Sequence, residues 1–211
     1  MIEGQQLREM RITLRDEGIA VFQLEAPGDP LHSSPWDAPW LTDPAFSAIH
    51  DSMKGSTLVD RNRCYSLYEL AGQTRDVPGD VLEVGVWRGG TTALLAQSAP
   101  ERTVYAADTF TGVVKGSALD PHYKGGEHAD TTRELVESLL GDLGVSNVVI
   151  LEGIYPDDTG TIIADKALSL VHIDVDTHDS AADAFHACGP MFLLEGWWFL
   201  MITAFDRLAV E

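Results

Sequence analysis

Cysteine and basic residues are scarce in this sequence, and long apolar segments are absent. Two cysteines, Cys64 and Cys188, cannot supply the disulfide framework of a small secreted protein. Only 14 lysines and arginines stand against 33 aspartates and glutamates, which gives a formal net charge of −19. Such a charge repels nucleic-acid backbones and anionic lipid surfaces. The longest largely apolar stretch, Trp197 to Phe205, is too short to cross a bilayer. We therefore expect neither a nucleic-acid nor a membrane partner.

The remaining composition is that of an ordinary globular protein. A chain of 211 residues with 45% hydrophobic residues is long enough to bury a full core. The polar stretch from Met1 to Arg15 does not resemble a signal peptide, so we expect a cytoplasmic protein. The acidic excess favours a cationic cofactor or a divalent metal, although it also fits a surface that only promotes solubility.

The segment from Asp80 to Thr92 carries the clearest motif. It combines a short apolar strand over residues 81–86, a turn with Gly85, Gly89 and Gly90, and the start of an apolar helix over 91–97. This strand–turn–helix order is typical of the first nucleotide-binding unit of an open α/β sheet. The spacing fits neither the dinucleotide nor the phosphate-loop fingerprint. It matches the way class I methyltransferases hold S-adenosylmethionine, and the alternative is an ordinary tight turn.

Strands and helices alternate regularly from this segment onward. Further apolar strands are expected over residues 103–107, 148–151, 168–174 and 197–205, with helices between them. This alternation predicts an α/β fold with a mostly parallel sheet covered on both faces. We expect one domain over residues 46–211, preceded by an N-terminal arm over residues 1–45. Large aromatic side chains are costly to expose, so Trp36 and Trp40 in that arm are expected to pack against the domain or against a second chain, and we expect a homo-oligomer.

Asp108 ends the second strand of this series. In nucleotide-binding α/β folds, an acid at this position accepts hydrogen bonds from the ribose hydroxyls. An acid that merely ends a strand is the simpler explanation. The combination with the glycine turn favours the ribose role.

Four motifs in register resemble the macrocin O-methyltransferase family. They are Glu83-Val-Gly-Val-Trp-Arg-Gly-Gly-Thr, Asp108-Thr-Phe-Thr-Gly112, Gly153-Ile-Tyr-Pro-Asp-Asp-Thr159 and His172-Ile-Asp-Val-Asp-Thr-His-Asp-Ser180. The resemblance covers about residues 43–206. It implies a class I methyltransferase fold, a Rossmann-like three-layer sandwich, and S-adenosylmethionine as cofactor. It also implies Mg²⁺ beside the acceptor and a role in antibiotic or secondary-metabolite biosynthesis.

The resemblance implies a set of cofactor-binding residues. Glu83, Gly85 and Gly89 would line the methionine end of the cofactor, and Asp108 would bind its ribose. Gly153 and Ile154 would lie beside the adenine. The remaining residues expected to contact the cofactor are Trp87, Thr91, Thr109 and Asp174.

Asp174 and Asp176, at the end of a predicted strand, form the expected chemical centre. Two carboxylates so placed can approach a hard divalent ion. The resemblance implies that Asp174 is a metal ligand, and a metal would lower the pKa of an acceptor hydroxyl. Asp176 is expected on the acceptor side. His178 is a candidate general base, with a polar helix-cap residue as the equal alternative.

The segment from Lys115 to Asp130 resembles the acceptor-side cover of the family. His122, Tyr123 and His128 are the residues expected to contact the acceptor, and the glycines between them suit a mobile cover.

The resemblance weakens near residue 200. If the family pattern is aligned without a gap, the expected second metal ligand falls on an apolar residue. If a short insertion is allowed, Asp206 takes the position of that ligand. The final strands of the fold also have no counterpart in this sequence, which would leave a sheet edge bare.

The sequence thus predicts an S-adenosylmethionine-dependent, Mg²⁺-assisted O-methyltransferase. Its acceptor would be a sugar hydroxyl of a nucleotide sugar or a glycosylated natural product. The alternatives are an N-methyltransferase for an amino sugar and a non-catalytic S-adenosylmethionine-binding subunit. A dinucleotide-dependent enzyme is disfavoured by the glycine spacing.

Overall fold

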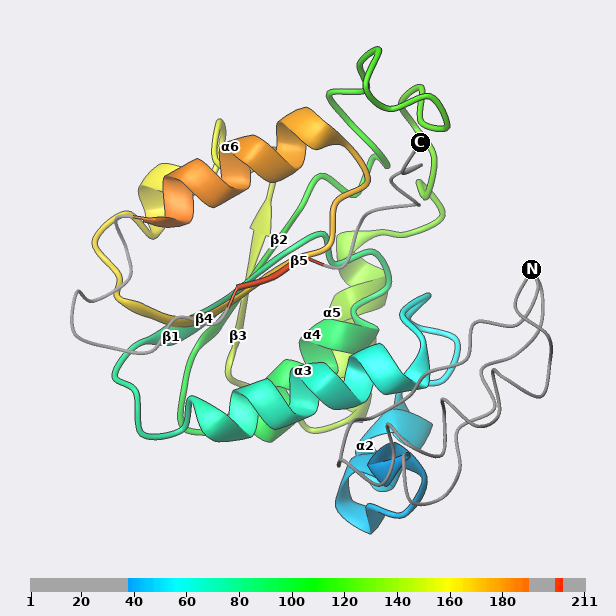
Figure 1. Cartoon of the computed structure of the whole chain (residues 1–211), viewed down its shortest axis with the longest axis vertical. Coiled ribbons are helices and arrows are strands. Elements are labelled where there is room, and N and C mark those ends of the chain that lie inside the picture. The colour runs from blue at the N-terminus through cyan, green and yellow to red at the C-terminus, as the bar shows by residue number, and fades with distance from the viewer. Residues whose placement is uncertain (1–37, 190–199, 203–211) are drawn as a thin grey trace, which may run out of the picture. The chain divides into compact units, whose positions relative to one another are not determined.

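Strands and helices alternate through most of the chain (Figure 1). The computed structural model describes residues 38–189 and 200–202. Its helices are η1 (Pro39–Leu41), α2 (Pro44–Ser52), α3 (Arg61–Gln73), α4 (Gly90–Ser98), α5 (Arg133–Asp142), η2 (Gly160–Ile162) and α6 (His178–Cys188). Its strands are β1 (Asp80–Val84), β2 (Val104–Asp108), β3 (Val148–Glu152), β4 (Leu168–Ile173) and β5 (Leu200–Ile202). The predicted α/β alternation is confirmed.

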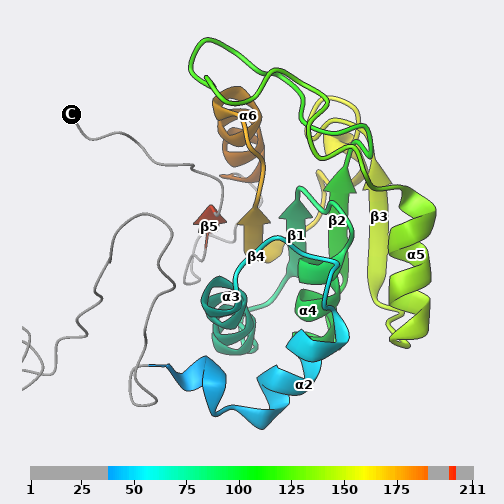
Figure 2. The ribbon, with the colours of Figure 1, turned by 90° about the vertical axis from the view of Figure 1, so that its right-hand side faces the viewer.

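The five strands form one parallel sheet in the order β3-β2-β1-β4-β5. Figure 2 shows the strand arrows side by side and pointing the same way. The chain moves outward from β1 to β3 and then returns to the other side of β1 with β4. The strand order therefore reverses between β1 and β4, and ligands of open α/β sheets bind at the carboxyl ends of strands beside such a reversal.

Helices cover both faces of the sheet, as expected for a three-layer sandwich (Figure 1). On one face, Ala181, Ala184 and Cys188 of α6 pack with buried residues of β1 and β4, including Leu82 and Val171. On the other face lies a second buried cluster, formed by Val86, Ala93, Ala106, Val136 and Leu140. Successive strand residues point to opposite faces, so near-continuous apolar strands supply both clusters.

Side-chain caps explain where several helices begin. Asp43, directly before α2, accepts a hydrogen bond from the Phe46 amide at 2.9 Å. Asp60 accepts from the Arg63 amide and caps α3 in the same way. Thr132 caps α5 by accepting from the Leu135 amide. Each cap satisfies one of the free N–H groups at a helix start.

The chain divides into two units after Ser47, and everything described below lies in the second unit. The predicted arm over residues 1–45 lies mostly outside the described residues, as does the expectation of missing final strands, so both stay predictions. No helix within residues 38–189 is long and apolar enough to cross a membrane.

Candidate cofactor and acceptor site

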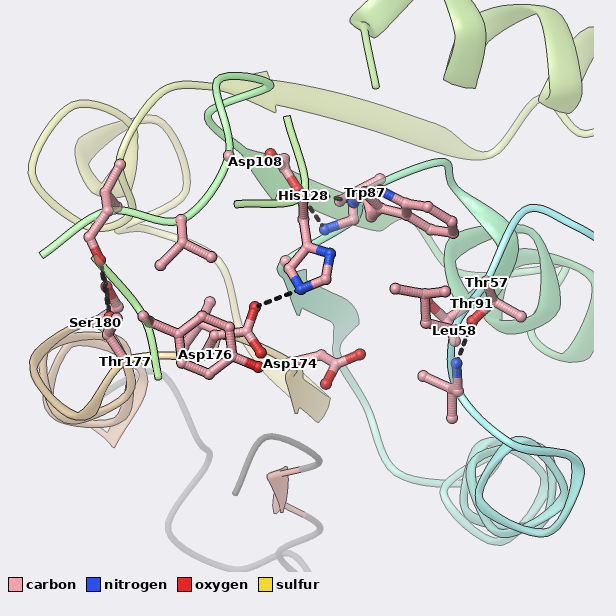
Figure 3. A pocket seen from close by; sticks show the side chains of 18 of the residues that line it. Thr57, Leu58, Trp87, Thr91, Asp108, His128, Asp174, Asp176, Thr177 and Ser180 are labelled. Carbon is pink, nitrogen blue, oxygen red and sulfur yellow. Dashed lines mark hydrogen bonds and ion pairs between the residues drawn. The ribbon is translucent and has the colours of Figure 1, made fainter. Parts of the chain in front are cut away.

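A cavity of about 520 Å³ opens at the carboxyl ends of β1, β2 and β4. Figure 3 shows its side chains pointing inward from the β1–α4 turn, the end of β2, the segment after β4 and the loop before α3. The lining residues are Thr57, Leu58, Val59, Arg63, Gly85, Val86, Trp87, Thr91, Asp108, Gly112, Val113, Val114, Tyr123, His128, Asp174, Val175, Asp176, Thr177 and Ser180. The cavity therefore lies beside the reversal in strand order.

The β1–α4 turn needs glycine at two positions for steric reasons. Gly85 has φ of 93°, and a Cβ there would lie 2.1 Å from the Asp174 carbonyl oxygen. Gly90, at the start of α4, donates its amide to the Ser56 carbonyl oxygen at 2.8 Å. A Cβ on Gly90 would lie 2.6 Å from that same oxygen. These glycines allow the turn to approach both the end of β4 and the loop before α3.

Asp108 holds the glycine turn from the neighbouring strand end. Its Oδ2 accepts hydrogen bonds from the amides of Val86, at 2.7 Å, and Trp87, at 2.8 Å. Its Oδ1 accepts from the Phe110 amide at 2.7 Å. A carboxylate has about four acceptor positions, so these three bonds leave about one for a ligand hydroxyl in the cavity.

Carboxylates and an imidazole also meet in the cavity lining. Asp174 and Asp176 follow β4, and the Asp176 Oδ2 lies 3.8 Å from Nε2 of His128. Figure 3 shows His128 and Asp176 facing each other, with Asp174 beside them. The Tyr123 ring lies next to His128, with 6.3 Å between ring centroids. A hydroxyl near this group would have both an acid and a base within reach.

The segment between β2 and α5 is docked onto α6 by several polar contacts. The Asp120 Oδ1 accepts from the His178 amide at 2.8 Å, so this loop residue caps α6. The hydroxyls of Thr177 and Ser180 donate to the Val114 carbonyl oxygen. The Lys115 ammonium lies 2.7 Å from Asp183 and 2.8 Å from Asp157. The segment expected as a mobile cover is thus docked against α6 in this structure, and its mobility stays a prediction.

The docking contacts also shift two pKa values. The His178 amide is the largest influence on Asp120, and it lowers the pKa of that carboxyl below its usual range. Burial of the Lys115 ammonium acts to lower its pKa, but hydrogen bonds to Asp157 and Asp183 outweigh this effect and raise it. Both groups are therefore charged at neutral pH, as their contacts require.

The cavity brings together eight of the residues predicted from the sequence. On the cofactor side these are Gly85, Trp87, Thr91 and Asp108, and on the acceptor side Tyr123, His128, Asp174 and Asp176. Their proposed roles stay predictions, but their common location agrees with them.

Seven predicted site residues lie outside the cavity lining, and Asp206 lies outside the described residues. Glu83 is fully buried, and Gly89 faces Val136 on α5. His178 is exposed at the start of α6, with its Nδ1 3.0 Å from Asp179. The remaining four are Thr109, His122, Gly153 and Ile154. The His178 side chain thus lies outside the cavity lining at the start of α6, and its role as base or helix-cap residue stays a prediction.

A metal site is not complete within residues 38–189. No three histidine, cysteine, aspartate or glutamate side chains there come together in a way that could hold a metal ion. Asp174 and Asp176 offer two carboxylates, and the second predicted ligand, Asp206, is not among the described residues. The described residues thus do not fit a magnesium site by themselves, and no reaction step below depends on one.

The sequence analysis did not identify the cavity residues from the loop before α3. Thr57, Leu58 and Val59 reach the cavity because this loop lies on the start of α4, where Gly90 leaves room for it. Gly90, the second glycine of the Gly89-Gly90 pair, was the signal that a segment packs closely there, but that segment, at Ser56, is distant in sequence. Thr177 and Ser180 also line the cavity without having been predicted as site residues, and their hydroxyl oxygens lie 2.7 Å apart.

Two curated proteins are similar to parts of the chain. The chain is 30% identical over 136 residues to demethyldecarbamoylnovobiocin O-methyltransferase of Streptomyces niveus, which covers 58% of this chain and 52% of that protein. It is 52% identical over 66 residues to mycinamicin III 3''-O-methyltransferase of Micromonospora griseorubida, covering 28% and 26%. The chain thus spans about half the length or less of these relatives.

A solved structure and a family model match larger parts of the chain. The crystal structure of the calicheamicin methyltransferase CalS11 superposes with a TM-score of 0.56 at 19% identity, over 81% of each chain, which supports the fold. The model of the family described as Macrocin-O-methyltransferase (TylF) matches residues 48–200, which include the whole cavity. The chain therefore belongs to the macrocin O-methyltransferase family.

Proposed function

We propose that this protein is an S-adenosylmethionine-dependent O-methyltransferase that acts on a sugar hydroxyl of a glycosylated natural product. The observation that carries the proposal is the shared cavity. The glycine turn and Asp108 line it together with Asp174 and Asp176, and His128 lies between Asp108 and Asp176. Family membership and the names of two relatives agree with this chemistry.

The chain's residues fit S-adenosylmethionine in shape and charge. Gly85 has no side chain, so the turn can approach the Asp174 carbonyl oxygen, where a Cβ would clash. Asp108 keeps an acceptor position for a ribose hydroxyl. Three carboxylates, Asp108, Asp174 and Asp176, line the cavity and favour a positively charged ligand. When bound, S-adenosylmethionine supplies an electrophilic methyl group attached to a sulfonium.

The acceptor-side residues would hold the hydroxyl and take up its proton. Asp176 and His128 lie 3.8 Å apart, so a hydroxyl beside the pair can donate to one while it is oriented by the other. Bound S-adenosylmethionine would supply the methyl group that replaces the hydroxyl proton, and this pair would take up that proton. The pair thus performs positioning and base catalysis in one place.

Charge in the cavity favours a glycoside over a nucleotide sugar as the acceptor. Arg63 is the sole lysine or arginine among the described lining residues, and it forms an ion pair with Asp60. Lys115, next to the lining residue Val114, is held by Asp157 and Asp183. A diphosphate would therefore face carboxylates without an available cationic partner from the described lining.

Calorimetric titration of S-adenosylhomocysteine into the purified chain tests the cofactor assignment. We expect one site of micromolar affinity, and the Asp108→Ala variant should bind about tenfold more weakly because a charged acceptor is lost. Asp142→Ala, an exposed aspartate on α5, is the matched control and should bind like the wild type. Absence of binding, or binding of NADH instead, would contradict the proposal.

Methyl transfer from S-adenosylmethionine tests the acceptor class. Demethyldecarbamoylnovobiocin and mycinamicin III, the compounds in the names of two relatives, are the first acceptors to try, beside a thymidine diphosphate sugar. We expect turnover of a glycoside and none of the diphosphate. Parallel reactions with Mg²⁺ and with EDTA test the magnesium dependence that the family resemblance predicts.

A further inference from the structure

Asp130 connects the glycine turn to the end of the segment between β2 and α5. Its Oδ1 accepts from Nε1 of Trp87 at 2.9 Å, and its Oδ2 accepts from Nη2 of Arg88 at 2.7 Å. Nε of Arg88 donates to the Asp130 carbonyl oxygen at 3.0 Å, and the Thr131 hydroxyl donates to the Trp87 carbonyl oxygen. We refer to these four residues, Trp87, Arg88, Asp130 and Thr131, as the clasp.

Trp87 is held at every polar group by the clasp and by Asp108. Its amide donates to Asp108, its carbonyl accepts from Thr131, and its indole N–H donates to Asp130. It also has φ of 49°, which is costly for a bulky side chain unless surrounding contacts fix it. Because Trp87 lines the cavity, these contacts fix part of the cofactor-side wall.

Asp130 of the clasp lies two residues after His128, which is on the acceptor side. The preceding residue, Glu127, accepts the amides of Lys124 and Gly125 with its carboxylate, both at 2.9 Å. Its carbonyl oxygen accepts the Val113 amide at 2.8 Å. The stretch 124–131 is therefore fixed to the loop at one end and to the glycine turn at the other, with His128 between these attachments.

The clasp is a charged interaction at neutral pH. The hydrogen bond from the Trp87 indole is the largest influence on the Asp130 carboxyl and lowers its pKa. The Arg88 guanidinium also lies 4.7 Å from the centre of the Trp87 ring, so it contacts both Trp87 and Asp130. The Asp130 side chain is 60% exposed, so solvent screens its charge, and the clasp connects the two walls through its several hydrogen bonds together.

We propose that Asp130 is a positioning residue that couples the two sides of the cavity, so that a ligand bound at the glycine turn also steadies His128 on the acceptor side. This inference rests on the proposed function, because it takes the glycine turn as the cofactor side. It adds that cofactor and acceptor bind cooperatively. By thermodynamic linkage, an acceptor bound beside His128 then strengthens cofactor binding by the same factor.

Hydrogen exchange measured with and without S-adenosylhomocysteine tests the coupling. In the free wild type, we expect slow exchange of amides in residues 124–131, and in Asp130→Ala about tenfold faster exchange there. With ligand, the wild type should gain protection both in residues 85–90 and in 124–131. Asp130→Ala should gain it only in 85–90. Trp87→Phe, which keeps the ring but lacks the indole donor, should behave like Asp130→Ala.

Two further variants separate coupling from general loss of structure. Asp130→Asn keeps one acceptor oxygen and should give intermediate protection in residues 124–131. Glu137→Gln is the matched control, because it removes a surface ion pair with Arg133 on α5 without touching the clasp. It should exchange like the wild type in every state.

The outcomes distinguish this inference from the proposed function. Ligand binding with equal protection of residues 124–131 in wild type and Asp130→Ala would overturn the coupling alone. A wild type that binds the ligand but gains no protection in residues 124–131 would also overturn the coupling alone. Failure of the wild type to bind S-adenosylhomocysteine would overturn the cofactor assignment and the coupling together.

Discussion

The Glu83 carboxylate and the His172 imidazole lie 2.9 Å apart, with both side chains fully buried. The two residues are direct neighbours across β1 and β4. The Thr92 hydroxyl of α4 donates to the other carboxylate oxygen. Glu83 thus joins two central strands and a helix directly beneath the cavity floor, and its interactions are those of a residue that supports the site from below.

Removal of Glu83 should cost much of the stability of the fold. Glu83→Ala leaves His172 and Thr92 buried without this partner, so we expect a loss of about 3 kcal/mol or more in the free energy of unfolding. Denaturant unfolding measures it. Glu101→Ala, at an exposed site, should change it by less than about 0.5 kcal/mol. A Glu83→Ala protein as stable as that control would refute the supporting role.

A methyl group on Gly85 should damage the cavity. Gly85→Ala places a Cβ 2.1 Å from the Asp174 carbonyl oxygen at a positive φ, so we expect destabilisation by at least about 2 kcal/mol and weaker S-adenosylhomocysteine binding. Gly72→Ala is the matched control, since it lies in α3 with open space around it. That change should stabilise the protein by about 0.5–1 kcal/mol. Thermal unfolding of the two variants side by side gives the comparison.

The stability supplied by Asp120 should depend on pH in the acid range. Its folded-state pKa is lowered by the His178 amide, so its contribution is present above the ordinary aspartate pKa of about 3.9 and is lost as pH falls through the lower folded value. At pH 7, Asp120→Ala should be less stable than the wild type by about 1 kcal/mol, the usual value of a helix cap.

Unfolding curves of wild type and Asp120→Ala between pH 7 and pH 3 measure this difference. The difference in the free energy of unfolding between wild type and Asp120→Ala should stay constant down to about pH 4 and then decrease. Asp142→Ala, at an exposed position at the end of α5, serves as the acidic control away from α6. A gap between wild type and Asp120→Ala that does not change with pH would show that the Asp120 charge does not cap α6.

His128 and His178 should differ in their effect on methyl transfer. His128 lines the cavity opposite Asp176, whereas His178 is exposed beside Asp179. We expect His128→Ala to lower the rate constant of methyl transfer by about a hundredfold, the usual contribution of one general base, with little change in S-adenosylhomocysteine affinity. His178→Ala should retain the wild-type rate. Equal losses in both variants would argue against His128 as part of the reacting group.

Local patterns in the sequence predicted the fold well. Apolar strands, glycine turns and helix caps act over a few residues, and the strand ends at Val84, Asp108 and Ile173 fall close to the predicted positions. The residues directly after these strands reach one cavity because parallel strands end on the same edge of a sheet. Position at a strand end therefore identified most of the predicted site residues that line the cavity.

Contacts between distant segments could not be predicted in the same way. Glu83 follows the family motif, but its burial depends on its neighbour His172 in β4 and on Thr92 in α4. His178 follows a promising acid-rich strand end, yet the start of α6 turns its side chain to the surface. Asp130 belongs to no motif, and its two partners lie far earlier in the chain. Tertiary approach, rather than local pattern, decides all three cases.

The cavity also has a consequence for how the protein folds. Its walls come from segments between Thr57 and Ser180, so the site spans most of the described chain. A parallel sheet of distant strands must pair before these walls meet, and such non-local pairing is slow. During refolding, ligand binding should therefore appear with the last phase, after helical signals have recovered. A ligand that binds only the completed site then stabilises the whole folded state by mass action.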